Sequence, residues 1–93
     1  MSNAQRVAVL LAAEIIKANG PTSSTALRAA GKHIRGIPPT TMRDALSMAN
    51  LLGHLACARN MFDGTRYWII PGITQLPPGM YIPGDRGNEQ IPF

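Results

Sequence analysis

The sequence predicts a small α+β domain, because three helical patterns are followed by two short strand patterns within 93 residues. Gly and Pro separate the helical segments, and Asp63-Gly64 lies between the strands, which is typical of a tight hairpin. After residue 70 the frequent prolines and glycines rule out regular helix. We therefore expect a folded domain over residues 1–70 and an extended Pro/Gly-rich C-terminal arm over residues 71–93.

The first helix is expected from about Ala4 to Asn19, with Gly20 as its C-terminal stop. Its predicted buried stripe consists of Val7, Leu10, Leu11, Ile15 and Ala18. Val9 and Ile16 fall outside this stripe, so the helix is apolar around much of its girth. Such a helix needs cover on more than one side, from the C-terminal arm or from a second subunit.

The second helix is expected from about Ser24 to Ala30, with Ser23 as its N-cap and Gly31 as its stop. A long connection over residues 31–39 would follow, because it contains two glycines and two prolines. This connection would place the basic residues Lys32 and Arg35 in a loop.

The third helix is expected to begin at a Thr40 or Thr41 cap and to reach Leu52. Three- and four-residue spacing predicts a buried face made of Met42, Ala45, Leu46, Ala49 and Leu52. The opposite face carries Thr40, Arg43, Asp44 and Ser47. Two strands over residues 55–59 and 65–70 then form a hairpin in which Cys57 is a small buried side chain.

The charge distribution favours an anionic partner. The net charge is +4, and the excess lies within residues 28–66, where six basic side chains face two acidic ones: Arg28, Lys32, Arg35, Arg43, Arg59 and Arg66 against Asp44 and Asp63. Nucleic acid is a common partner for such a surface. The single cysteine suits a reducing compartment, so we expect a cytoplasmic protein. The apolar run over residues 7–13 is too short to span a bilayer, and no membrane partner is expected.

No catalytic or cofactor motif is apparent. The five carboxylates are scattered, and no serine lies in a Gly-x-Ser-x-Gly elbow. The segment from Gly31 to Gly36 lacks the Gly-Lys-Ser/Thr ending of a phosphate-binding loop. His54 and Cys57 are three residues apart but have no second pair of ligands, so a structural zinc site is not expected. We expect neither an enzyme nor a metal or cofactor.

The order and punctuation of these elements over residues 5–70 resemble the winged helix-turn-helix family. Four segments carry the resemblance. Residues 15–21 end helix 1, residues 23–27 begin helix 2, residues 49–55 end helix 3, and residues 65–71 form the returning strand of the wing. The resemblance implies three helices plus a two-stranded β wing. It also implies sequence-specific binding of double-stranded DNA by a small transcriptional regulator, with helix 3 in the major groove.

The resemblance assigns DNA contacts to four segments. Helix 3 would supply base and phosphate contacts through Thr40, Thr41, Arg43, Asp44 and Ser47. The wing would contact the backbone or minor groove through Arg59, Asn60, Thr65 and Arg66. Ser24 and Thr25 at the start of helix 2 would offer backbone N–H groups to a phosphate. Lys32 and Arg35 would add salt-dependent attraction.

Two further hypotheses follow from the apolar residues. A homodimer through helix 1 and the C-terminal arm would cover the apolar excess of both, and would place two DNA half-sites about one helical turn or a multiple apart. Alternatively, the same fold serves as a non-enzymatic protein-interaction module, an inhibitor or adaptor of another complex, because fold does not fix function. Duplex binding that falls steeply with salt would distinguish DNA binding from this alternative.

Overall fold

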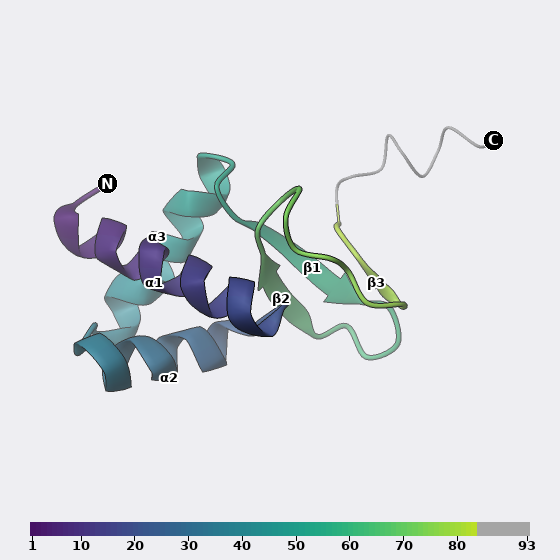
Figure 1. Ribbon diagram of the computed structural model, residues 1–93, viewed down its shortest axis with the longest axis horizontal. Coiled ribbons are helices and arrows are strands. Elements are labelled where there is room, and N and C mark those ends of the chain that lie inside the picture. The colour runs from purple at the N-terminus through teal and green to yellow at the C-terminus, as the bar shows by residue number, and fades with distance from the viewer. Residues whose placement is uncertain (84–93) are drawn as a thin grey trace.

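The computed structural model describes residues 1–83, and the predicted arm beyond them, residues 84–93, lies outside the described part. Three helices occupy one half of the molecule and an antiparallel sheet occupies the other (Figure 1). The elements are α1 (Asn3–Asn19), α2 (Ser24–Arg35), α3 (Pro39–Leu51), β1 (Ala56–Asn60), β2 (Arg66–Ile69) and β3 (Met80–Tyr81). The predicted α+β class is confirmed.

Helix α1 has the predicted bounds, but a different face of it is buried. Ser2 and Gln5 form a reciprocal capping box at its start, and Gly20 ends it with φ 83°. The buried residues are Ala8, Leu11, Ala12 and Ile16. Leu10 is 66% exposed and Val7 42% exposed, and Ala18 is exposed as well, so the predicted stripe is wrong at these three positions. Ala8 and Ala12 are fully buried, so α1 faces the other helices through small residues. The prediction was wrong because it assigned the buried face mainly to the large apolar side chains.

Helix α2 continues through Gly31 to Arg35, so the predicted stop at Gly31 is wrong. Gly31 is buried inside the helix, and a Cβ built there would lie 2.7 Å from the Met42 methyl carbon of α3. The glycine therefore leaves room for the buried Met42 side chain of α3. The actual C-cap is Gly36 in the left-handed conformation, at φ 65°. The predicted N-cap is confirmed, because the Ser23 hydroxyl accepts from the backbone N–H of Ala26.

Only residues 36–38 connect α2 to α3, in place of the long connection expected from the sequence. Helix α3 begins at Pro39 after an N-cap at Pro38, with no side-chain cap, so the predicted threonine cap is wrong. Four of the five predicted core positions are confirmed: Met42, Ala45, Leu46 and Ala49. Leu52 is 55% exposed, because the helix has ended and the residue lies in the following turn.

Strands β1 and β2 form the predicted hairpin, in a register that pairs Cys57 with Trp68. The link between α1 and α2 joins the edge of this sheet, because the backbone groups of Thr22 and Trp68 exchange hydrogen bonds of 3.1 and 2.6 Å. The Trp68 indole N–H also donates to the Ser24 hydroxyl oxygen at 2.7 Å. One residue of β2 therefore fastens the sheet to α2.

A third strand makes the predicted two-stranded wing wrong. Residues of β3 pair with the end of β1, and the backbone N–H of Met61 donates to the Gly79 carbonyl at 2.8 Å. The chain after β2 crosses the sheet before it forms β3 (Figure 1). Ala58 and Ile69 are buried but lie outside the cluster that joins the helices. Because side chains alternate along a strand, the two faces of the sheet serve two different packing layers.

Candidate nucleic-acid interface

The residues predicted to bind DNA fall into two groups, one on α2 and α3 and the other on β1 and β2. In Figure 1 the α2–α3 connection and the β1–β2 turn lie on opposite sides of the molecule. A single short stretch of surface therefore does not hold all of them. Each group has its own geometry and its own electrostatics.

The helical group centres on a hollow of about 200 Å³ lined by Arg28, Pro39, Thr40 and Arg43, which we call the helical hollow. Arg28 comes from α2, and the other three residues come from the first turns of α3. Arg28 was absent from the predicted site, because the sequence placed it merely on the outside of a short helix. The short connection between α2 and α3, which the sequence did not predict, brings Arg28 beside Arg43.

Within this group Arg43 shares its charge with a carboxylate. The Arg43 Nη2 and Nε atoms donate to the Asp44 Oδ1 atom at 3.2 and 3.3 Å. Both side chains are more than half exposed, so this ion pair contributes little to stability. It does hold the guanidinium close to the surface of α3. An incoming anion has to compete with Asp44 for Arg43.

The start of α3 supplies backbone donors beside these arginines. Pro39 has no N–H, and no side chain caps the next N–H groups, those of Thr40 and Thr41. The positive end of the helix dipole lies at the same place. Together with Arg28 and Arg43, these groups form a surface suited to a phosphate or to the acceptor atoms of a base.

The remaining helical residues of the predicted site are placed as follows. Ser47 is exposed on the same side of α3 as expected, whereas Thr41 is half-buried. Thr25 is exposed at the start of α2, but the Ser24 hydroxyl is occupied by the Trp68 indole. Lys32 and Arg35 are exposed in the last turns of α2 rather than in a loop. The Ser24 hydroxyl is therefore part of the scaffold, and the phosphate contact of the Ser24 backbone N–H stays a prediction.

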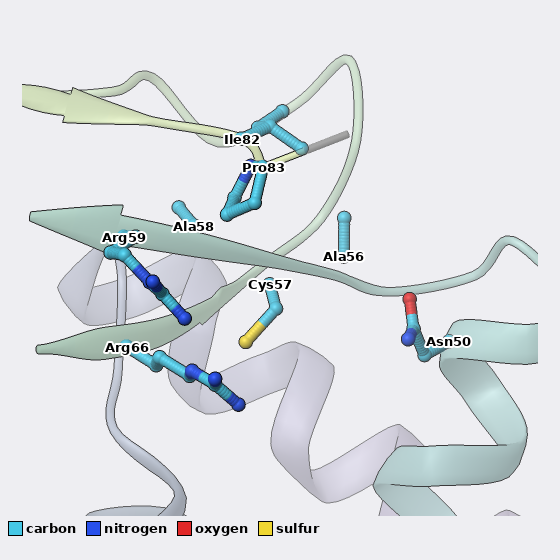
Figure 2. Close-up of a pocket in the computed structure, with 8 residues that line it drawn as sticks. All are labelled: Asn50, Ala56, Cys57, Ala58, Arg59, Arg66, Ile82 and Pro83. Atoms are coloured by element: carbon cyan, nitrogen blue, oxygen red, sulfur yellow. The ribbon is translucent and has the colours of Figure 1, made fainter. Parts of the chain in front are cut away.

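The sheet group consists of Arg59 and Arg66, which lie directly opposite each other on β1 and β2. Figure 2 shows both side chains on the same side of the sheet as the Cys57 sulfur, while Ala56 and Ala58 point the other way. The two arginines line an open cavity of about 330 Å³, to which Asn50, Ile82 and Pro83 also contribute. We call Arg59 and Arg66 the sheet arginine pair.

No carboxylate among residues 1–83 forms an ion pair with the sheet arginine pair. The Nε atom of Arg59 is buried and has no hydrogen-bond partner in the described part of the chain. Like charges opposite each other destabilise a sheet, and a buried donor without a partner adds to that cost. A bound anion would relieve both.

The positive charges of these arginines influence the pKa of Cys57. Burial raises the pKa of the Cys57 thiol, while the positive charges of Arg66 and Arg59 act in the opposite direction. The thiol therefore lies within electrostatic reach of both guanidinium groups. This arrangement was not predictable from the sequence, because the three residues meet only through the strand register.

The turn between β1 and β2 uses its polar side chains to hold its own backbone. The Asn60 Oδ1 atom accepts from the backbone N–H groups of Phe62 and Asp63 at 2.8 and 3.4 Å. Asp63 Oδ1 accepts from the Thr65 N–H at 2.9 Å, and hydrogen bonding to Thr65 lowers the pKa of Asp63. Asn60 thus shapes the turn, while the Thr65 side chain stays exposed.

Two properties of residues 1–83 bear on other kinds of site. No group of three or more His, Cys, Asp or Glu side chains is placed to hold a metal ion. None of the helices α1–α3 has the length and apolar character needed to cross a bilayer.

No protein-family model, curated protein or solved structure matches this chain.

Proposed function

We propose that this protein binds double-stranded DNA as a winged helix-turn-helix domain, with α3 as the reading helix. The observation that carries the proposal is the junction of α2 and α3, where a three-residue turn containing Gly36 places the helical hollow at the start of the second helix. Helix-turn-helix units have such short, glycine-containing turns. They contact base edges with the first residues of their second helix.

The residues of the helical hollow suit different parts of the duplex. Arg43 reads a base, because a guanidinium bonded to guanine is worth about 1 to 3 kcal/mol of discrimination. Arg28 and the free N–H groups at the start of α3 bind a phosphate. Asp44 releases Arg43 when a base replaces it, or accepts from a cytosine amino group. Specificity then comes from an exchange of partners at Arg43.

The sheet supplies the second contact. The sheet arginine pair, whose charge no carboxylate of the described residues offsets, binds the DNA backbone, with the β1–β2 turn as the wing. The hydrogen bonds of Thr22 with Trp68, which attach the link before α2 to the sheet, support a rigid placement of this wing relative to α2. The third strand is a departure from the two-stranded wing that the resemblance implies. A small cytoplasmic regulator of transcription is the role we propose.

The first test measures duplex binding against salt. A labelled random duplex is titrated with protein at several salt concentrations, and fluorescence anisotropy gives the affinity at each. Removing one phosphate-binding arginine should lower the salt slope by about one, so Arg28→Ala and Arg66→Ala are the informative variants. Lys17→Ala is the charge-matched control, because Lys17 is exposed on α1 and lines neither the helical hollow nor the cavity of the sheet arginine pair.

Absence of duplex binding even at low salt would overturn the proposal. If the duplex binds, selection of bound fragments from a random pool tests specificity. Arg43→Ala should then relax the preference at one base position, while binding to random DNA falls much less. An unchanged preference would remove Arg43 from the reading role.

The second candidate function is a protein-interaction module, favoured by the exposed apolar residues of the β1–β2 turn. Phe62 is 83% exposed and Met61 63% exposed, although Phe62 lies against Gly79. Large exposed apolar side chains often mark contact surfaces. Under this alternative, duplex binding is absent at low salt and Phe62→Ser lowers the amount of a specific complex. Under the DNA proposal, Phe62→Ser leaves the salt slope unchanged.

A further inference from the structure

The outer face of α1 carries an apolar residue that nothing in the described chain covers. Leu10 is 66% exposed at the centre of this face, and Val7 beside it is 42% exposed. The buried residues Ala8, Ala12 and Ile16 lie on the opposite side of the helix. We propose that this face binds α1 of a second copy in antiparallel orientation, with the two-fold axis passing beside Leu10.

Charge complementarity selects both the partner and the orientation. Arg6 and Glu14 are exposed and lie four residues before and after Leu10, on the same side of the helix. In an antiparallel pair centred on Leu10, Arg6 of each copy lies opposite Glu14 of the other, and two equal ion pairs form. A parallel pair would instead place like charges together. A self-complementary surface of this kind is what a two-fold interface requires.

The surface on either side of Leu10 has the relief that such packing needs. A hollow of about 400 Å³ on one side is lined in part by Arg6, Val9 and Leu52. A hollow of about 170 Å³ on the other side is lined in part by Val7 and Glu14. Leu10 lines both and forms the ridge between them. Helices pack by placing the ridges of one into the grooves of the other.

The expected dimer is weak. One pair of helices buries less than the roughly 1,200 to 2,000 Å² of a standard stable interface, so dissociation in the micromolar range or above is expected. The proposal does not depend on DNA binding, because the surface centres on α1, with Leu52 and Arg35 at its edges, and includes neither the helical hollow nor the sheet arginine pair.

Sedimentation equilibrium over micromolar to millimolar protein tests the interface. The unmodified chain should pass from monomer to dimer, and Leu10→Glu should remain monomeric. Arg6→Glu and Glu14→Arg should each weaken the dimer at least fivefold, and the double variant should recover most of the affinity. Arg66→Glu changes the charge by the same amount as Arg6→Glu but lies on β2, so it is the matched control. Far-ultraviolet circular dichroism checks that each variant keeps its helices.

Crosslinking tests the register independently. In a Cys57→Ser background, Leu10→Cys should form a disulfide-linked dimer under mild oxidation, because the two copies of this position meet at the axis. Lys17→Cys should not, because seven residues of helix place it about 10 Å from the axis and about 21 Å from its copy, beyond the reach of a disulfide.

Four results would overturn the proposal. The first is a monomer at all concentrations, and the second is a dimer that Leu10→Glu leaves intact. The third is a double charge exchange that fails to restore affinity. The fourth is faster crosslinking at position 17 than at position 10.

Discussion

The two basic groups of this protein use the same residue type in opposite electrostatic settings. In the helical hollow, Arg43 is exposed and already paired with Asp44 at 3.2 Å. In the sheet arginine pair, two guanidinium groups face each other, and within residues 1–83 no carboxylate pairs with them and the buried Arg59 Nε atom has no hydrogen-bond partner. An arginine that is already paired with a carboxylate binds only a ligand that replaces the carboxylate with equally good hydrogen bonds. An uncompensated pair attracts any anion, which makes the first group suited to selectivity and the second to attraction.

We expect the helical and sheet halves to unfold as one unit. Substitution of Trp68, which joins the two halves, tests this most strongly. Trp68→Ala should lower the free energy of unfolding by about 3 to 5 kcal/mol, because a large buried ring is lost, and chemical denaturation measures this. Ser24→Ala removes only the partner of the indole N–H and should cost about 0.5 to 1.5 kcal/mol. Separate transitions for the two halves in the unmodified chain would contradict a single unit.

The next largest effect should be confined to the helical half. Gly31→Val places a branched side chain where a Cβ alone would lie 2.7 Å from the Met42 methyl carbon. We expect a loss of about 1 to 3 kcal/mol from overpacking, and thermal unfolding measures it. Ala30→Val is the control, because it introduces the same residue type one position earlier in the helix. Equal losses for the two variants would mean that the close approach at Gly31 contributes nothing.

A smaller effect of opposite sign is expected in the sheet half. Arg66→Gln removes one of two like charges that face each other, so it should stabilise the sheet by up to about 1 kcal/mol. It should also raise the pKa of Cys57 further, because Arg66 is the stronger of the two charges that lower it. Since the thiolate is the reactive form, alkylation of Cys57 at mildly alkaline pH should slow severalfold.

The matched control for this effect is Arg43→Gln, which removes the same charge from the helical hollow. It should leave the alkylation rate of Cys57 unchanged. An equal slowing in both variants would mean that net charge, rather than the local pair, controls the thiol.

The smallest effect concerns acid stability of the β1–β2 turn. Hydrogen bonds from Thr65 lower the pKa of Asp63 in the folded chain, so the folded state binds a proton less readily than the unfolded state. The resulting stabilisation is present above the unfolded pKa and is lost as pH falls through the lower folded pKa. Because Asp63 is exposed, the change should be small. Urea denaturation below pH 5 measures it, and an identical acid profile for Asp63→Asn would contradict this account.

The sequence predicted those elements whose limits depend on neighbouring residues. The bounds of α1, the Ser23 cap of α2 and the two hairpin strands follow from local rules, and the structure confirms them to within about one residue. Four buried positions of α3 were also predictable from their spacing. In all these cases the deciding contacts lie within one element or between adjacent ones.

The errors came from contacts between distant residues. Glycine is typical of a helix stop, but Gly31 lies inside α2, where it is buried against Met42 of α3. The buried face of α1 is set by small residues that meet the other helices, so Leu10 remained exposed. Arg28 was missed in the site because its place beside Arg43 depends on the true length of α2. The pairing of β3 with β1 likewise has no local signal.

The attachment of Ser24 to Trp68 has a consequence for the order of folding events. These residues are 44 positions apart in the chain, and closing such a loop costs about 3 kcal/mol of entropy by the usual logarithmic rule. Contacts between residues near in sequence form sooner than those between residues far apart. We therefore expect the helices to associate first and the sheet to dock onto α2 late. Trp68, the chain's one tryptophan, would register this last step in its fluorescence.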